Sequence, residues 1–212
     1  MIFYDLDPRE LEILEIMVQL ITTSSYKLSK LSGMPSASVW RILIKLSNRG
    51  LVIKEERSFK ITPKGLAICY YSSKKGYIKE FAVRELKNQW KYEGSEEELK
   101  GFLNSLFSLL LKRGISPFCM CFTDPLPLAS IFLNSTEELN EDSRKAVARI
   151  LLSSLPSITL SNGCKAVVSF DCNGSIYGLA VNCKLSGLRI FHKCPLLEEE
   201  VKRIATSRRN IQ

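Results

Sequence analysis

The first third of the chain carries apolar residues at helical spacing and then at strand spacing. Spacings of three and four residues predict helices over residues 8–21, 25–31 and 36–49. The apolar side of the third helix would consist of Val39, Ile42, Leu43 and Leu46. Short apolar runs at residues 51–53 and 59–61 predict two strands joined by a polar link. We therefore expect a helix-rich segment that closes with a two-stranded hairpin.

The middle of the chain is dominated by longer amphipathic helices. Apolar stripes predict one helix over residues 77–90 and a second that begins at a capping box at Ser95. Residues 118–123 predict a short strand, and the prolines within residues 124–127 predict a turn.

The last quarter of the chain has the clearest strand pattern. Residues 165–171 and 175–184 alternate between apolar and polar, and Asn173-Gly174 between them is typical of a two-residue type I′ turn. Residues 188–193 predict a third strand, and residues 196–207 a closing helix. The sequence therefore predicts a small antiparallel sheet in this part of the chain.

A two-residue turn fixes which side chains face each other on this hairpin. Phe170 would face Tyr177, and Cys164 would face Cys183, with the apolar side chains of both strands on one face. Packing of two free thiols in the core is the favoured interpretation of the cysteine pair. A redox switch is the alternative.

Charge is concentrated in one segment. The chain has 30 Lys and Arg against 22 Asp and Glu, a net charge of +8. Residues 24–75 alone hold eleven of these bases and only two acids. A compact basic segment of this kind indicates an anionic partner, and nucleic acid is the first candidate.

Three motifs in the basic segment resemble a known family. The helix Ser36–Leu46, the sequence Arg49-Gly50-Leu51-Val52 and the step Ile61-Thr62-Pro63-Lys64-Gly65 are similar to those of MarR-like and related winged helix-turn-helix regulators. The resemblance covers residues 7–73, and residues 95–212 resemble nothing that we recognise. It implies a winged helix-turn-helix that binds double-stranded DNA in order to regulate transcription.

The fold class that follows is α+β in three parts. Residues 1–75 would be a winged helix-turn-helix DNA-binding domain, and residues 76–113 a helical connector that dimerises. Residues 114–212 would be an α+β domain with a small antiparallel sheet, which binds a small-molecule or protein effector or another partner.

The candidate DNA-binding residues follow from the outer side of the third helix and from its neighbours. Ser38 and Arg41 are placed to reach base edges, and Lys45 and Arg49 to reach phosphate. The full set is Lys27, Lys30, Ser36, Ser38, Trp40, Arg41, Lys45, Arg49, Lys54, Arg57 and Lys60. Glu55-Glu56 between the two strands argue against deep insertion of a wing.

Trp40 and Ile44 keep a second interpretation open, because both are unusually apolar for a surface that faces DNA. In this alternative the chain is a winged-helix subunit of a larger transcription or replication assembly and binds protein through the same helix.

We expect a homodimer, because a two-fold protein matches a palindromic DNA site. The two amphipathic helices are the candidate interface, although such stripes also serve as ordinary core. The interface residues would be Ile78, Phe81, Leu86, Trp90, Leu99, Phe102, Leu106 and Leu110.

The remaining patterns argue against catalysis. The sequence has no glycine-rich phosphate loop and no GxSxG or HExxH motif, and it holds a single histidine. Its seven cysteines lack a CxxC pair, so we expect no metal and no cofactor, and a thiol- or metal-based sensor is a third interpretation. Apolar runs too short for a bilayer and an acidic start lead us to expect a cytoplasmic protein that is not an enzyme and has no contact with membranes.

Overall fold

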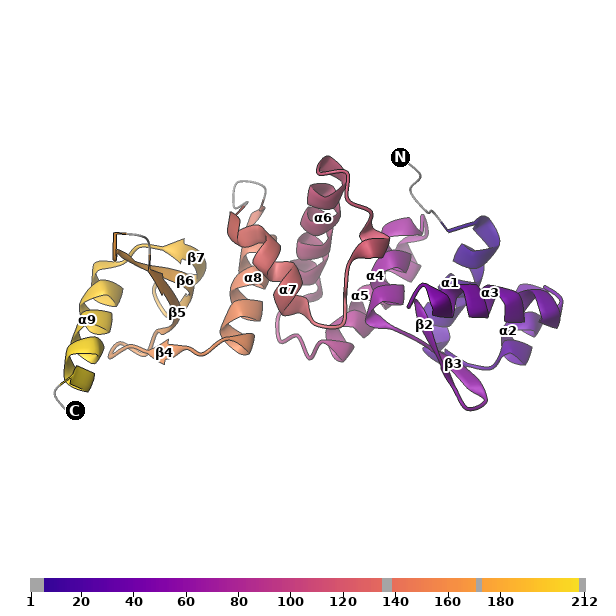
Figure 1. Cartoon of the computed structure of the whole chain (residues 1–212), viewed down its shortest axis with the longest axis horizontal. Helices are drawn as coiled ribbons and strands as arrows, with labels where there is room; N and C mark the ends of the chain where they lie inside the picture. The colour runs from indigo at the N-terminus through magenta and orange to yellow at the C-terminus, as the bar shows by residue number, and fades with distance from the viewer. Residues whose placement is uncertain (1–5, 135–138, 171–172, 210–212) are drawn as a thin grey trace. The chain divides into compact units, whose positions relative to one another are not determined.

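The computed structural model describes residues 6–134, 139–170 and 173–209. Over these ranges the chain is α+β, with helices and two small antiparallel sheets, as expected (Figure 1). Residues up to Tyr92, together with Leu106–Pro125, form one compact unit. Glu93–Ser105, together with the residues from Leu126 onward, form a second. The segment 76–113 is thus shared between the two units.

Three helices begin the first unit. α1 spans Pro8–Leu20, α2 spans Ser25–Ser32 and α3 spans Ser36–Asn48. The Asp7 carboxylate caps α1, because it accepts hydrogen bonds from the backbone N–H groups of Arg9 (2.8 Å) and Glu10 (3.0 Å). The four apolar residues predicted for the inner side of α3 are all buried.

A three-stranded antiparallel sheet in the order β1-β3-β2 completes this part of the first unit. β1 is Thr22–Thr23, β2 is Val52–Glu55 and β3 is Ser58–Ile61, and Val52 pairs with Ile61. β2 and β3 confirm the two strands that the sequence predicts. β1 has no signal in the sequence, because two threonines form no hydrophobic pattern.

The start of α4 (Pro63–Ser72) gives the Thr62-Pro63-Lys64-Gly65 step a physical explanation. The Thr62 hydroxyl donates to the carbonyl oxygen of Gly50 (2.7 Å) and accepts from the N–H of Gly65 (3.0 Å). A Cβ at Gly65 would lie 2.1 Å from the carbonyl oxygen of Leu51. This close approach of two backbone segments is open only to glycine.

The next helices are α5 (Gly76–Gln89) and α6 (Glu96–Lys112), close to the predicted bounds. The strand expected at residues 118–123 is absent from the structure, and a 3₁₀ turn, η1 (Pro117–Cys119), stands at its start. The turn expected at residues 124–127 is instead the start of α7 (Pro125–Ser130), which is followed by η2 (Ile131–Asn134). Proline is compatible with the first turn of a helix, so these prolines begin a helix where the sequence suggested a break.

The apolar side chains expected at a dimer interface lie mostly inside the chain. Phe81 is 43% exposed, but the indole N–H of Trp90 donates to the carbonyl oxygen of Phe122 (2.8 Å), and Phe102 packs edge-on against Phe132. The buried members of the set are Ile78, Leu86, Trp90, Leu99, Phe102, Leu106 and Leu110. The structure therefore places seven of the eight in the core and only Phe81 at the surface.

The second unit contains a four-stranded antiparallel sheet in the order β4-β5-β6-β7. Its elements are α8 (Glu141–Ser154), β4 (Ile158–Thr159), β5 (Lys165–Phe170), β6 (Ile176–Cys183), β7 (Gly187–His192) and α9 (Pro195–Arg209). Leu197 and Val201 of α9 pack on one face with Ala166 and Val181. α8 contacts β5, β6 and β7, and Figure 1 shows the sheet between the two helices.

The pairing of β5 with β6 keeps the predicted register over only half of its length. Ala166 faces Val181 as predicted, but Phe170 faces Ile176 rather than Tyr177. Val167 pairs with Ala180 and Val168 with Gly178, so Leu179 of β6 has no partner on β5. Such a β-bulge shifts every later side chain by one position.

Burial on the two faces of this sheet also differs from the prediction. Phe170, predicted to face the core, is 62% exposed, whereas Val167 and Ala180 are buried. Because helices cover both faces of the sheet, the strands do not keep one apolar and one polar side. The predicted two-residue loop involves Cys172, which lies outside the described residues, but the Phe170–Ile176 pair is incompatible with it.

Within residues 6–134, 139–170 and 173–209, no helix is both long enough and apolar enough to cross a bilayer.

Candidate nucleic-acid interface

α3 has one accessible stripe along its outer side. Ala37, Arg41, Lys45 and Asn48 are exposed on it, and Ile44 is half-buried among them. Their spacing of three and four residues places them on the same side of the helix, opposite the buried residues. A partner of α3 would therefore meet a mixture of cationic and small apolar groups.

α2 and the β2–β3 hairpin flank α3. The Ser36 hydroxyl at the start of α3 hydrogen-bonds to the hydroxyl of Ser29 on α2 (3.1 Å). On the hairpin side, the Trp40 ring meets Phe59 edge-on with 5.5 Å between centroids, and Lys54 Nζ lies 5.1 Å from the Trp40 centroid. Trp40 thus joins α3 to the hairpin and is only partly free to contact a partner.

Glu10 holds two of the expected phosphate-binding residues. It is 6% exposed, and its carboxylate contacts Arg49 Nη1 (3.1 Å) and Lys45 Nζ (3.7 Å). The Arg49 guanidinium also lies over the ring of Phe118, 4.3 Å from its centroid. Arg49 therefore supports the fold, whereas Lys45 is well exposed and makes only a long ion pair.

Most of the other expected cations remain available. Over the described residues, the side chains of Lys27, Arg41, Arg57 and Lys60 take part in no ion pair and no cation–π contact. Lys30 Nζ lies 4.7 Å from the centroid of Tyr26. All of these are exposed except Lys60, which is half-buried, as is the expected base-contacting residue Ser38.

The turn between β2 and β3 is less basic than the rest of this surface. Glu55 and Glu56 are exposed there beside Arg57, and Glu55 also accepts a hydrogen bond from the Ser58 hydroxyl (3.4 Å). Two carboxylates at the tip of the hairpin repel phosphate. The positive surface is thus strongest along α2, along α3 and at the base of the hairpin.

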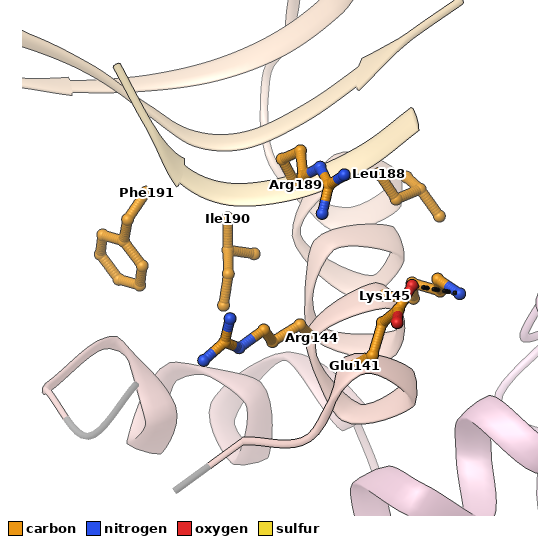
Figure 2. A pocket seen from close by; sticks show the side chains of 7 residues that line it. All are labelled: Glu141, Arg144, Lys145, Leu188, Arg189, Ile190 and Phe191. Carbon is orange, nitrogen blue, oxygen red and sulfur yellow. Dashed lines mark ion pairs between the residues drawn. The ribbon is translucent and has the colours of Figure 1, made fainter. Parts of the chain in front are cut away.

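The second unit has a pocket of about 370 Å³ between α8 and β7 (Figure 2). Arg144 and Arg189 give it positive charge, while Lys145 is paired with Glu141 (3.0 Å). That hydrogen bond lowers the pKa of Glu141 and raises the pKa of Lys145. Figure 2 shows the side chains of Ile190 and Phe191 both extending toward the helices below the strand.

Phe191 reaches this position because its φ is +51°, which breaks the alternation of side chains along β7. The sequence gives no signal for the pocket, since its charged residues are scattered over α8 and β7. Only the pairing of these two elements brings the charged residues together.

Comparisons with protein-family models, with curated proteins and with solved structures find no match to this chain. In the described ranges there is no group of three His, Cys, Asp or Glu side chains that could hold a metal ion. In the first unit, the candidate binding surface is the cluster of exposed cations on and around α3.

Proposed function

We propose that the first unit is a winged helix-turn-helix that binds double-stranded DNA and regulates transcription. In this proposal α2 and α3 are the two helices of the motif, α3 enters the major groove and the β2–β3 hairpin is the wing. The order of the elements supports it, and so does the burial of Val39, Ile42, Leu43 and Leu46, which leaves the other side of α3 open.

One observation carries the proposal. Arg41 lies in the middle of the accessible stripe of α3, is exposed, and has no ion-pair or hydrogen-bond partner within the described residues. An unpaired guanidinium on such a helix can make two parallel hydrogen bonds to guanine. The neighbouring cations Lys27, Lys30 and Lys54 would bind phosphate on either side.

Selection from a random duplex library followed by fluorescence anisotropy tests this function. The selected duplex should bind more tightly than a scrambled one, and its affinity should fall steeply as salt rises. Arg41→Ala should cost roughly 1–3 kcal/mol of binding free energy and relax the sequence preference at one base position. Lys165→Ala, which removes one exposed charge from β5, is the matched control and should bind like the wild type.

Two results would contradict the proposal. One is failure of the library to enrich any sequence. The other is unchanged binding of Arg41→Ala to the selected duplex at every salt concentration.

The alternative, a winged helix that binds protein, rests on exposed apolar side chains near α3. Tyr26 and Leu31 of α2 and Ile53 of β2 are each about half exposed or more, beside Trp40. Binding of protein through these groups would depend only weakly on salt, so the same salt titration distinguishes the two functions.

We also propose that the regulator acts as a homodimer and that the second unit responds to an effector. Of the expected interface residues only Phe81 is placed to meet a second copy, so Phe81→Glu should lower the dimer fraction seen by light scattering. A wild-type mass near 24.0 kDa at micromolar concentration would contradict the dimer. The α8–β7 pocket, with two arginines and an apolar wall, suits a small anionic effector that has a hydrophobic part.

A further inference from the structure

Cys164 lies directly before β5, and Cys183 is the last residue of β6. Lys165 pairs with Asn182, so the same register carried one residue further sets Cys164 opposite Cys183. Cys183 packs against the buried cluster that contains Cys164, so the two side chains are neighbours. Directly opposed residues of antiparallel strands have Cα atoms about 4.5–5.5 Å apart, which is within the range that a disulfide spans.

The two sulfurs have different surroundings. Cys164 is buried, and this burial raises the pKa of its thiol. Cys183 is half-buried at the end of β6, where its sulfur accepts hydrogen bonds from the backbone N–H groups of Leu185 and Ser186, both at 3.4 Å. All of these donors favour a negative charge on the Cys183 sulfur.

Ser186 lines the same pocket as Cys183. Its hydroxyl is buried and makes no hydrogen bond within the described residues, so its proton can turn toward the Cys183 sulfur. The Ser186 hydroxyl, the Cys164 thiol and the two backbone N–H groups together lower the pKa of Cys183 to about 6. At neutral pH the pair therefore consists of a thiolate at Cys183 and a thiol at Cys164.

A small apolar pocket gives access to the pair. It has a volume of about 180 Å³, and both sulfur-bearing residues line it together with Leu185, Leu197, His192 and Cys194. In the described part of the chain, no three metal-ligating side chains are grouped closely enough to hold an ion, so nothing there favours a metal at these thiols. A mainly apolar pocket beside a thiolate admits small neutral molecules.

We propose that Cys183 and Cys164 form a reactive dithiol site that reduces hydroperoxides and closes to a disulfide. The Cys183 thiolate attacks the terminal oxygen of the hydroperoxide, an S–O bond forms and the O–O bond breaks. The alcohol or water leaves with a proton from solvent, and Cys183 is oxidised to the sulfenic acid. The Cys164 sulfur then attacks this sulfur, and the S–S bond forms as the S–O bond breaks.

The second step releases water, which takes the proton of the Cys164 thiol. Overall, two thiols and one hydroperoxide give one disulfide, one water and one alcohol, or a second water when hydrogen peroxide is the oxidant. Cys183 is the attacking thiol because its negative charge is stabilised, and Cys164 is the resolving thiol because it lies directly beside Cys183. This reaction does not depend on DNA binding.

Mass spectrometry of the full chain tests the site. The reduced wild type, treated with one equivalent of hydrogen peroxide or of tert-butyl hydroperoxide, should become lighter by two hydrogen atoms. Peptide mapping should locate the disulfide at Cys164–Cys183. Cys164→Ser should stop at a sulfenic acid on Cys183 that dimedone traps, and Cys194→Ser, in the same pocket, should behave like the wild type.

A second measurement needs no variant. The rate at which iodoacetamide alkylates Cys183 in the wild type should reach half of its plateau near pH 6, while Cys164 stays unmodified at that pH. The exposed residue Cys119 reports on general reactivity in the same digest.

Three results would overturn the proposal. They are an unoxidised Cys183 after peroxide treatment, a disulfide that joins Cys183 to any cysteine other than Cys164, and a half-plateau for Cys183 near the ordinary thiol pKa of about 8.5.

Discussion

Both units pair a buried carboxylate with a cation, as Arg149 pairs with Glu98 (2.8 Å) in the second, but they differ in the groups that surround the side chains to which we assign a function. In the first unit, two buried carboxylates are matched by cations, Glu10 by Arg49 (3.1 Å) and Glu15 by Lys75 (2.6 Å). In the second, the sulfur of Cys183 is stabilised by backbone N–H groups at the end of a strand. Whether a charged side chain can bind or react thus depends on the ion pairs and hydrogen bonds that it already makes within the fold.

This difference separates the candidates for function from the residues that only support the fold. Arg49 is as basic as Arg41, but its contact with Glu10 and its position over Phe118 tie it to the interior of the first unit. Arg41 remains unpaired within the described residues, so it can bind a partner without loss of an internal contact. In the second unit the reverse holds, because the contacts that Cys183 makes are the ones that activate it.

The largest expected effect comes from the closest backbone approach in the first unit. Gly65→Ala would place a Cβ 2.1 Å from the carbonyl oxygen of Leu51, and a backbone atom cannot move aside cheaply. We expect a loss of about 3 kcal/mol in the free energy of unfolding, measured by denaturant titration.

Gly76→Ala at the start of α5 is the matched control for this substitution, since nothing lies within 4 Å of its Cβ. It should stabilise the protein by about 0.5 kcal/mol. Equal stability of the two variants would show that the first unit does not depend on the contact between Gly65 and Leu51.

A smaller loss is expected for the corresponding change in the second unit. Gly178→Ala would place a Cβ 2.3 Å from a methyl group of Val181 and 3.1 Å from Leu197. The nearest backbone atom, the carbonyl oxygen of His192, would lie 3.2 Å away, and the closer groups are side chains that can rotate. The loss should therefore be about 1–2 kcal/mol in the same titration. A loss larger than that of Gly65→Ala would show that the contacts at Gly178 adjust less readily than the backbone approach at Gly65.

The smallest effects should separate the two cations that contact Glu10. Lys45→Ala should lower the slope of log affinity for DNA against log salt by about one unit, because Lys45 is exposed enough to reach phosphate. Arg49→Ala should leave that slope unchanged and cost about 1–2 kcal/mol of stability, because Glu10 loses its shorter ion pair. The opposite result, a salt slope that changes for Arg49→Ala alone, would show that Arg49 and not Lys45 binds phosphate.

The sequence by itself determined the first three helices and the two hairpin strands of the first unit, although not β1 or the 3₁₀ turn at Pro117–Cys119. The bounds of α1, α2 and α3 follow from caps, from helical spacing and from glycine at helix ends, as at Asp7 and Gly50. These signals act over a few residues, so no tertiary contact is needed to interpret them. Arg41 could be predicted in the same way, because exposure on a helix follows from its spacing relative to the buried stripe.

Only the tertiary structure decided the partners of residues far apart in the chain. The sequence did not show that Arg49 contacts Glu10. It also did not show that seven of the eight expected interface residues are buried in the core, because an apolar stripe on a helix fits a surface or an interior equally well. The bulge at Leu179 had no signal either, since β6 is covered on both faces and its apolar residues do not mark a register. The predicted register holds on the side of the bulge away from the hairpin loop, and this register places Cys164 opposite Cys183. The N–H groups that stabilise the Cys183 sulfur belong to the turn after β6, which the sequence did not predict.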